Sequence, residues 1–392
     1  MNIPYGRQTI DSKDTKAALK VLNSDFLTQG PHVPKFEKKL SNYVGARYAV
    51  ATNSATSALH IACLALGVKE NDYVWTSPIS FVASANCALF CGAKVDFVDI
   101  DIQTFNISTN SLAQKLEVAK KLNRLPKVLI PVHIAGQSCD MLEIKNLSKQ
   151  YGFKILEDAS HALGAKYRNS NVGSCQYSDI TVFSFHPVKM ITTGEGGALL
   201  TNNKKFFNMA TQLRSHGITR DPEEMEGSID GPWVYQQKLL GFNYRMTDFQ
   251  AALGSSQLDK LPKFIEKRRK IADMYNNLLD SSNIHTPCES DKNYSSYHLY
   301  IIRIKNNAEI GDRKQVFEKL RSQGIIVNVH YIPIYKQPYY RALGFKNDSD
   351  FPNSEMYYSQ AISLPIYPGL SEAKIKYVVS SIQKSVGHQT IF

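Results

Sequence analysis

Apolar positions along the first two thirds of the chain follow two alternating patterns. Short β-branched runs bounded by polar or turn residues predict seven strands, at 48–52, 73–76, 94–98, 128–133, 153–157, 180–185 and 197–201. Between them, residues 55–66 and 141–151 repeat apolar side chains at helical spacing. This alternation predicts the α/β class, with a mostly parallel sheet covered by helices on both faces. Ligands of such sheets bind beyond the carboxyl ends of the strands.

The pattern is lost between residues 215 and 237. This segment holds five acidic residues, two prolines and no sustained period, which predicts a long loop. A loop of this length in a compact enzyme is often functional.

We expect a large domain over 1–250, which includes the N-terminal segment, and a smaller domain over 251–392.

The last third of the chain predicts a smaller α+β region. A helical stretch over 247–278 leads into it. Asp312, with Gln315 three residues on, has the spacing that opens a helix. The other expected elements are strands at 297–304 and 325–331 and a final helix after Ser371.

Composition narrows the class of protein. A chain of 392 residues with 43% hydrophobic and 21% charged residues is neither disordered nor collagen-like, and it is long enough for two domains. Lys and Arg outnumber Asp and Glu by 46 to 35, which gives a net charge of +11. The densest cluster, KRRK at 267–270, lies in a helical pattern without interleaved aromatic residues, so we expect no nucleic-acid partner. The dispersed surplus favours a phosphorylated substrate.

The cysteines and the apolar runs bear on metal binding and location. The six cysteines show neither CxxC pairing nor a histidine at zinc-ligand spacing, so we expect buried free thiols and no metal site. The first residues lack the basic start and apolar core of a signal peptide. The longest apolar run, 79–90, is too short to span a bilayer. These features predict a cytoplasmic protein without a membrane partner.

Lys189 is the first candidate for chemistry. It stands in FSFHPVKMITTGEGGALL, just beyond an expected strand and before a Gly-rich turn. Apolar neighbours let a lysine amine lose its proton near neutral pH, as Schiff-base chemistry requires. From local composition alone, a surface lysine in a loop is an equal alternative.

Two further features gain meaning beside Lys189. Asp158 ends the run FKILED, where a carboxylate can reach a ligand at the sheet edge. It could also be a helix cap or a turn residue, and a cap is the stronger interpretation of this residue alone. Residues 52–57 link a strand to a helix and form either an anion site or a simple N-cap. An amine, a carboxylate and a helix N-terminus together suit an aldehyde cofactor that carries a pyridine ring and a phosphate.

Seven motifs then carry a family resemblance. They are LTQGP (27–31), NSATSALH (53–60), SPISFVASAN (77–86), EDASHALGA (157–165), SFHPVKMITTGEGG (184–197), GFNYRMTDFQAALGSSQL (241–258) and VHYIPIYKQPYY (329–340). In their order and spacing the chain resembles the sugar aminotransferases of the DegT/DnrJ/EryC1/StrS family over nearly its whole length. The resemblance implies the type I fold of pyridoxal 5'-phosphate enzymes, that cofactor, and a homodimer with shared active sites.

The same resemblance implies roles around the ring of the cofactor. Lys189 would be the catalytic residue and would bind the aldehyde covalently, and Asp158 would hold the protonated ring nitrogen. Phe81 would stack on the ring, with His161 beside it. A core aromatic and a satisfied polar residue are the alternatives for these last two.

The resemblance also implies phosphate and substrate contacts. The amides of Ala55 and Thr56 and the side chain of Ser184 would hold the phosphate, and Asn243 would reach it from the neighbouring subunit. The positions matched by substrate contacts in the family are Tyr5, Asp25, Phe26, Leu27, Thr28, Asn328, Val329, His330 and Tyr331. Each of these could equally be structural.

The finer match is to the branch of the family that aminates a UDP-linked 4-keto-6-deoxy-N-acetylhexosamine in pseudaminic acid biosynthesis. It implies transfer of an amino group from L-glutamate to the 4-keto carbon of the sugar nucleotide. Two alternatives remain: an aminotransferase of another nucleotide-linked 3- or 4-keto-6-deoxy sugar, and a catalytically silent protein of the same fold that acts as a sensor.

Overall fold

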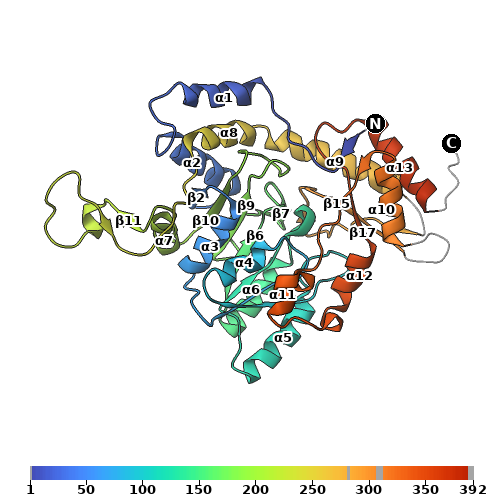
Figure 1. The fold of residues 1–392 in the computed structure, drawn as a ribbon, viewed down its shortest axis with the longest axis horizontal. Coiled ribbons are helices and arrows are strands. Elements are labelled where there is room, and N and C mark those ends of the chain that lie inside the picture. The colour runs from blue at the N-terminus through green and yellow to red at the C-terminus, as the bar shows by residue number, and fades with distance from the viewer. Residues whose placement is uncertain (1, 280–282, 306–311, 387–392) are drawn as a thin grey trace.

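The largest sheet of the protein has seven strands among residues 2–279, 283–305 and 312–386, which the computed structural model describes (Figure 1). In spatial order they are β2 (Tyr48–Thr52), β10 (Gly197–Thr201), β9 (Ile180–Ser184), β6 (Lys154–Asp158), β5 (Val128–Ile130), β3 (Tyr73–Thr76) and β4 (Lys94–Phe97). Only β10 runs against its neighbours in this sheet. The expected α/β fold with a mostly parallel sheet is confirmed.

Successive residues of a strand point to opposite faces of the sheet, and the central strands are apolar at both. Helices therefore cover both faces of this sheet. Val50 packs in one core with α3 (Ala55–Ala65), α4 (Ala83–Leu89) and α7 (Lys204–Arg214). Its neighbour Ala49 belongs to a second core, which includes side chains of α2 (His32–Val44) and α8 (Asp248–Leu258). On the side of Leu129 and Ile155 the sheet is covered by α5 (Thr109–Lys121) and α6 (Met141–Tyr151).

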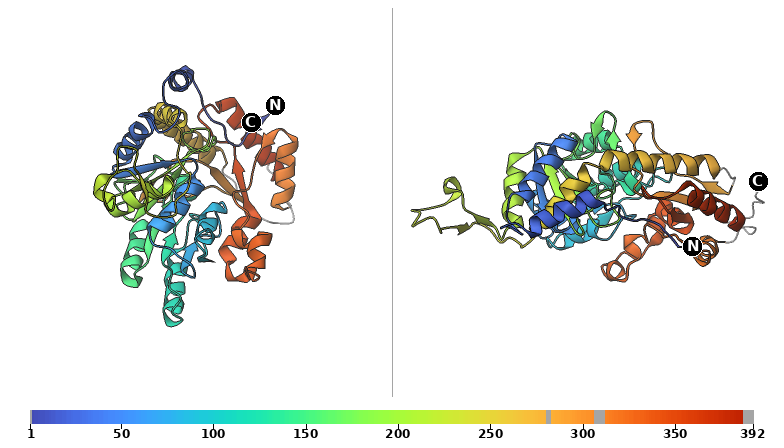
Figure 2. Two further views of the ribbon diagram at one scale, coloured as in Figure 1. Left: turned by 60° about the vertical axis from the view of Figure 1, so that its left-hand side comes forward. Right: turned by 90° about the horizontal axis from the view of Figure 1, so that it is seen from above.

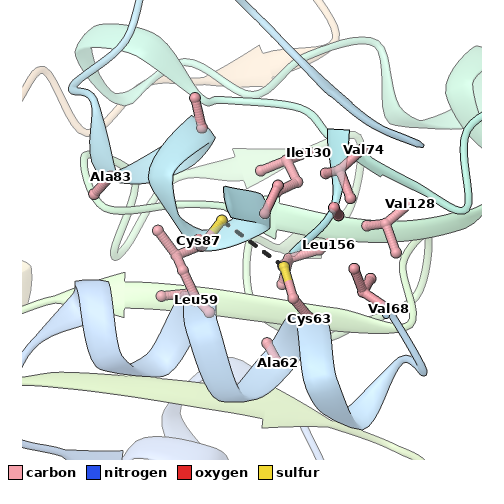
Figure 3. Packing of buried hydrophobic residues seen from close by; sticks show 14 of the residues in the cluster. Leu59, Ala62, Cys63, Val68, Val74, Ala83, Cys87, Val128, Ile130 and Leu156 are labelled. Carbon is pink, nitrogen blue, oxygen red and sulfur yellow. Dashed lines mark hydrogen bonds between the residues drawn. The ribbon is translucent and has the colours of Figure 1, made fainter. Parts of the chain in front are cut away.

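The helix α3 shows how the sequence pattern produces this packing. Leu59, Ala62 and Cys63 share one face of the helix and point toward Leu156 and the other buried side chains of the sheet (Figure 3). Ser54 fixes where the helix begins, because its side chain accepts a hydrogen bond from the Ser57 N–H at 3.1 Å. This hydrogen bond therefore holds the turn between β2 and α3 in place.

The last third of the chain forms a second core. Its sheet consists of β13 (Ile284–His285), β15 (Tyr300–Ile304) and β17 (Ala361–Leu364), packed with α9 (Leu261–Leu278), α10 (Arg313–Ser322) and α13 (Glu372–Ser385). Asp312 and Gln315 form the predicted capping box of α10. Ile3 is buried in this core, because β1 (Ile3–Pro4) pairs with β16 (Ile325–Ile326). The N-terminal strand thus lies against the C-terminal part of the chain (Figure 1).

The structure also contains other helices and short strands. They include α1 (Ser12–Leu22), α11 (Pro338–Ala342), α12 (Pro352–Gln360), β7 (Lys166–Tyr167), β8 (Ser170–Asn171) and β14 (Asn293–Tyr294). Among the described helices, none has the length and apolarity that crossing a bilayer requires.

Three sequence expectations need correction. The strand expected over 128–133 ends at Ile130, where Pro131 follows and offers no N–H for the ladder. The strand expected over 325–331 is confined to β16, and residues 328–331 turn toward the cavity described below. The helical stretch over 247–278 is two helices, because Pro262 near the start of α9 cannot continue α8.

The acidic segment expected as a loop carries a small amount of regular structure. Ile218–Thr219 (β11) pairs antiparallel with Gln236–Gln237 (β12), and residues between them extend away from the body of the protein (Figure 2). The segment between the two strands exposes apolar side chains, including 68% of Trp233. At the base of the projection the two ends of the segment meet, because Ser215 and Asn243 form an isolated antiparallel bridge.

A buried carboxylate locks the middle of the sheet. Glu157 on β6 is 4% exposed and accepts hydrogen bonds from His133 Nε2 at 2.6 Å, from Thr181 at 3.0 Å and from Ser178. The backbone N–H of Cys139 donates to His133 Nδ1, so the ring carries its proton on Nε2. Burial alone raises the pKa of Glu157, but these bonds lower that pKa below its ordinary value.

We expect Glu157→Ala to lower the free energy of unfolding by about 3 kcal/mol, because it leaves the buried donors unpaired. The ionised Glu157 contributes its full stabilisation at pH values above the ordinary pKa of a glutamate side chain. This contribution to the free energy of unfolding is lost as the pH falls through the lower pKa of Glu157 in the folded protein. Urea unfolding at neutral and acidic pH measures both effects. The exposed Glu143 on α6 provides a control, and its alanine variant should lose less than about 1 kcal/mol. Equal losses at the two positions would contradict the assignment.

Candidate active site

The side chains at the carboxyl ends of β6 and β9 meet in one cavity of about 540 Å³. Because β10 returns antiparallel beside β9, and Gly197 pairs with Ser184, the connection between them stays at this edge of the sheet. That connection carries Lys189. The cavity-lining residues that the sequence predicted are Tyr5, Ala55, Thr56, Phe81, Asp158, His161, Ser184, Lys189, Asn328, Val329, His330 and Tyr331.

Lys189 lies in a turn, where its N–H donates to the carbonyl of His186 at 2.9 Å. Its side chain is partly buried in the cavity, between Met190 and Val188 along the chain. Removal from water lowers the pKa of the amine to about 8, although the charge of Asp158 opposes this. About a tenth of the amine is therefore uncharged at pH 7, far more than for an ordinary lysine, and this fraction is able to act as a nucleophile or base.

Asp158 is the acidic group opposite this amine. The side chain is 5% exposed, and Oδ2 accepts a hydrogen bond from the Ser84 hydroxyl at 2.6 Å. Oδ1 accepts from the backbone N–H of Ser160 at 3.1 Å. The helix-cap alternative is not observed, because Asp158 is the last residue of β6 and no helix follows directly.

The start of α3 forms the polar end of the cavity. Ala55 and Thr56 are the first two residues of the helix, where backbone N–H groups have no acceptor within the helix. Gly197 packs directly on this turn, and a Cβ there would lie 2.5 Å from the N atom of Ala55. Glycine thus lets β10 approach the helix start while Ser184 stands beside it in register. Such a turn is a ready anion site.

Aromatic rings line the space between these polar groups. Phe81 exposes 58% of its surface, and its ring centroid lies 6.3 Å from that of Tyr331. His161 accepts the Ala135 N–H on Nδ1 at 3.3 Å, so its neutral ring donates from Nε2 to the Tyr331 hydroxyl at 3.1 Å. Burial and the nearby charge of Lys189 hold the pKa of His161 well below its ordinary value. His161 is therefore a neutral donor here.

The far wall of the cavity comes from both ends of the chain. Tyr5 stacks obliquely on His330 at 5.1 Å between centroids, and its carbonyl accepts the Ile366 N–H. His330 bonds to the Ser363 hydroxyl at 2.8 Å, and burial lowers its pKa to about 3. Asn328 lies next to it, 3.4 Å away between side-chain nitrogens. These groups offer a sugar hydroxyl several hydrogen-bonding partners.

Five predicted site residues do not reach this cavity within the chain. Asn243 is exposed, and so are the four residues from Asp25 to Thr28. They gather on a separate face: Thr28 bridges to Thr247, and the N–H of Asp248 donates to the carbonyl of Leu27 at 2.9 Å. The four residues are Asp25, Phe26, Leu27 and Thr28.

The sequence analysis missed several residues in or next to the cavity, of which Ser84, His298 and Glu195 bear on its chemistry. Ser84 contacts Asp158, as described above. His298 is 4% exposed, and its Nδ1 has no hydrogen-bond partner among the described residues. Glu195 reaches the cavity from the connection between β9 and β10. Ser84 could have been found from its place in the SPISFVASAN motif, whereas no local pattern marks His298.

The cavity fits pyridoxal phosphate. Lys189 could provide an amine for the aldehyde, and the Asp158 carboxyl group could accept a hydrogen bond from the ring nitrogen. The turn at Ala55, cleared by the absence of a side chain at Gly197, provides N–H donors for the phosphate.

Comparison with known proteins agrees with this geometry. Residues 8–383 match the model of the DegT/DnrJ/EryC1/StrS aminotransferase family. A UDP-4-amino-4,6-dideoxy-N-acetyl-beta-L-altrosamine transaminase of Campylobacter jejuni is 38% identical, over 97% of this chain and 96% of that protein. The solved structure of Helicobacter pylori PseC, an aminotransferase of pseudaminic acid biosynthesis, is 33% identical with a TM-score of 0.88, over 98% and 99% of the two chains.

A second solved structure bears on the cofactor. It is the PLP form of Spr1654 from Streptococcus pneumoniae, described as a sugar aminotransferase, with 28% identity, a TM-score of 0.87 and coverage of 98% and 99%. The family match, the fold and the cavity agree on one activity. The chain belongs to the DegT/DnrJ/EryC1/StrS aminotransferase family and is a sugar aminotransferase that depends on pyridoxal phosphate.

Proposed function

We propose that the protein moves an amino group from L-glutamate to the 4-keto carbon of a UDP-linked 2-acetamido-2,6-dideoxy-hexos-4-ulose. The observation that carries this proposal is the similarity, over nearly the full length, to the Campylobacter jejuni transaminase and to the Helicobacter pylori structure. The cavity supports it, because Lys189 supplies an acid–base group, Asp158 supplies a partner for the ring nitrogen, and the wall around His330 supplies partners for a sugar.

Lys189 is proposed as the residue that moves protons. When bound, pyridoxal phosphate supplies an aldehyde that exchanges one amine for another and a ring that withdraws electrons from the reacting carbon. Nζ of Lys189 would take a proton, as a base, from the carbon that bears the donor amine. In the second half of the reaction it returns a proton as an acid. A pKa of about 8 suits both roles near neutral pH.

The other residues bind and orient. Asp158 stabilises a positive charge on the ring nitrogen through its ionised carboxylate, which Ser84 and Ser160 hold in place. The N–H groups of Ala55 and Thr56 and the side chain of Ser184 bind the phosphate. Phe81 covers one face of the ring, and Tyr331 lies nearby to bind substrate.

A homodimer would account for the predicted residues that lie away from the cavity. We propose that Asn243 and the segment from Asp25 to Thr28 complete the cavity of a neighbouring copy. Apolar side chains are exposed in both segments, with 55% of Phe26 and 51% of Leu27 exposed beside Asp25, and 81% of Leu240 exposed three residues before Asn243. Burying such side chains between two copies is favourable, since large exposed apolar patches commonly mark interfaces.

Lys189→Ala should abolish transamination and leave the fold intact, because it removes the covalent anchor and the proton carrier but little packed volume. Turnover with glutamate and far-UV circular dichroism measure the two effects. Lys166→Ala, at an exposed lysine on β7, is the matched control and should keep wild-type turnover. Undiminished turnover of the Lys189 variant, purified free of host transaminases, would refute its role.

The shared-site proposal predicts complementation between inactive subunits. Mixing Lys189→Ala with Asn243→Ala should restore activity, because each heterodimer assembles one cavity with both residues intact. The control mixes Lys189→Ala with the double variant that lacks both residues, which should stay inactive. Background activity in heterodimers verified by native mass spectrometry would contradict a shared site.

The substrate proposal predicts a preference for the acetamido group. A pocket that hydrogen-bonds this amide leaves polar groups unpaired when the amide is missing. UDP-linked 2-acetamido-4-keto-6-deoxy sugars should therefore exceed dTDP-linked keto sugars without it by at least about tenfold in kcat/KM. Mass spectrometry of the aminated products gives the comparison. An equal or reversed preference would favour another nucleotide-linked 3- or 4-keto sugar as the acceptor.

A further inference from the structure

We infer that Ser84, supported by Ser80, is a positioning residue that fixes the orientation of the Asp158 carboxylate through a relay of two hydroxyl groups. The inference rests on the proposed role of Asp158 at the ring nitrogen. The relay is continuous: Ser80 Oγ lies 2.6 Å from Ser84 Oγ, which lies 2.6 Å from Asp158 Oδ2. All three side chains are buried, with exposures of 3%, 0% and 5%.

The direction of the relay follows from proton counting. An ionised carboxylate only accepts hydrogen bonds, so the single proton of the Ser84 hydroxyl must point to Asp158. The Ser84 oxygen is then free to accept, and Ser80 donates to it. Hydrogen bonds donated to a carboxylate favour its charged form and fix its orientation. With the Ser160 N–H on Oδ1, both carboxylate oxygens have donors.

The hydroxyl of Ser84 has no role in forming its own helix. It stands in the first turn of α4, where a serine side chain often caps backbone N–H groups, but the N-cap residue Val82 has no side-chain cap. The hydroxyl instead crosses to a strand 74 residues away in the chain. Its neighbours on α4 are mostly small apolar residues, among which a buried hydroxyl is costly unless it is hydrogen-bonded.

The position of Ser80 connects the relay to the cavity itself. Ser80 lines the cavity and directly precedes Phe81, the aromatic residue proposed to cover the ring. The same short segment therefore sets the orientation of the carboxylate and the place of the aromatic ring. The charged and titratable groups that act on the carboxylate are Lys189, from the connection after β9, and the Tyr331 hydroxyl. Neither donates a hydrogen bond to it in the structure, so its hydrogen-bond donors are Ser84 and the Ser160 N–H.

The first test compares cofactor affinity in four proteins: wild type, Ser84→Ala, Asp158→Asn and the double variant. Titration of the cofactor-free protein with pyridoxal phosphate gives the dissociation constants. Ser84→Ala should weaken binding about tenfold, since hydrogen bonds to charged groups have this order of effect. Added to Asp158→Asn, it should change binding less than about twofold, because the charge on which it acts is gone.

The second test follows the absorbance of the bound cofactor against pH, together with kcat and KM. Ser84→Ala should move the pH midpoint of the absorbance change and lower kcat about tenfold while both KM values change less than about twofold. Ser80→Ala should shift the midpoint in the same direction by a smaller amount. Ser77→Ala is the control, because this buried hydroxyl in the same segment bonds the Ile79 N–H and not Asp158.

The outcomes separate this inference from the proposed function. If Asp158→Asn weakens cofactor binding while Ser84→Ala matches wild type in affinity and midpoint, the relay is wrong and the role of Asp158 stands. An equal loss from Ser84→Ala in both backgrounds would show a structural effect and would also overturn the relay. If Asp158→Asn itself changes nothing, the proposed role of Asp158 fails and the relay with it.

Discussion

The reversal of one strand organises the whole site. A parallel strand that followed β9 would require a crossover connection, and the chain would leave the ligand-binding edge of the sheet. Because β10 returns antiparallel, residues 185–196 remain at that edge, and Lys189 is held among the carboxyl ends of the parallel strands. The same reversal places Gly197, the first residue of β10, against the start of α3. The amine and the anion-binding turn therefore owe their proximity to a single change of strand direction.

Charge in the cavity is arranged around this geometry. Asp158 ends β6, and Lys189 lies in the connection that follows the neighbouring strand β9. The two groups are close enough that the charge of the carboxylate opposes the lowering of the Lys189 pKa by burial. The surrounding histidines are neutral, since burial and the lysine charge both disfavour their protonated forms. The amine and the carboxylate are thus flanked by uncharged donors and acceptors, which suits a reaction whose charge changes centre on a bound ring.

Much of the fold was predictable from local sequence, and the site only in part. The alternation of strand and helix patterns predicted a mostly parallel sheet covered by helices. Capping patterns such as Asp312 with Gln315 marked helix starts. Lys189 and Asp158 were found because each follows a strand that the pattern identified. His298 and Tyr5 were harder to place, because they reach the cavity through pairings between distant segments. For Tyr5 only the family resemblance indicated a role, and periodicity contains no information on such pairings.

The pairing of β1 with β16 has a consequence for biosynthesis of the protein. Tyr5 is synthesised long before the two residues that it contacts, His330 on the cavity wall and Ile366. All seven strands of the large sheet precede β16 in the chain, whereas β1 cannot pair until β16 has been synthesised. Contacts so distant in sequence form slowly. The far wall of the cavity is therefore completed late, and a nascent chain that ends before β16 carries Lys189 and Asp158 in a cavity that lacks one side.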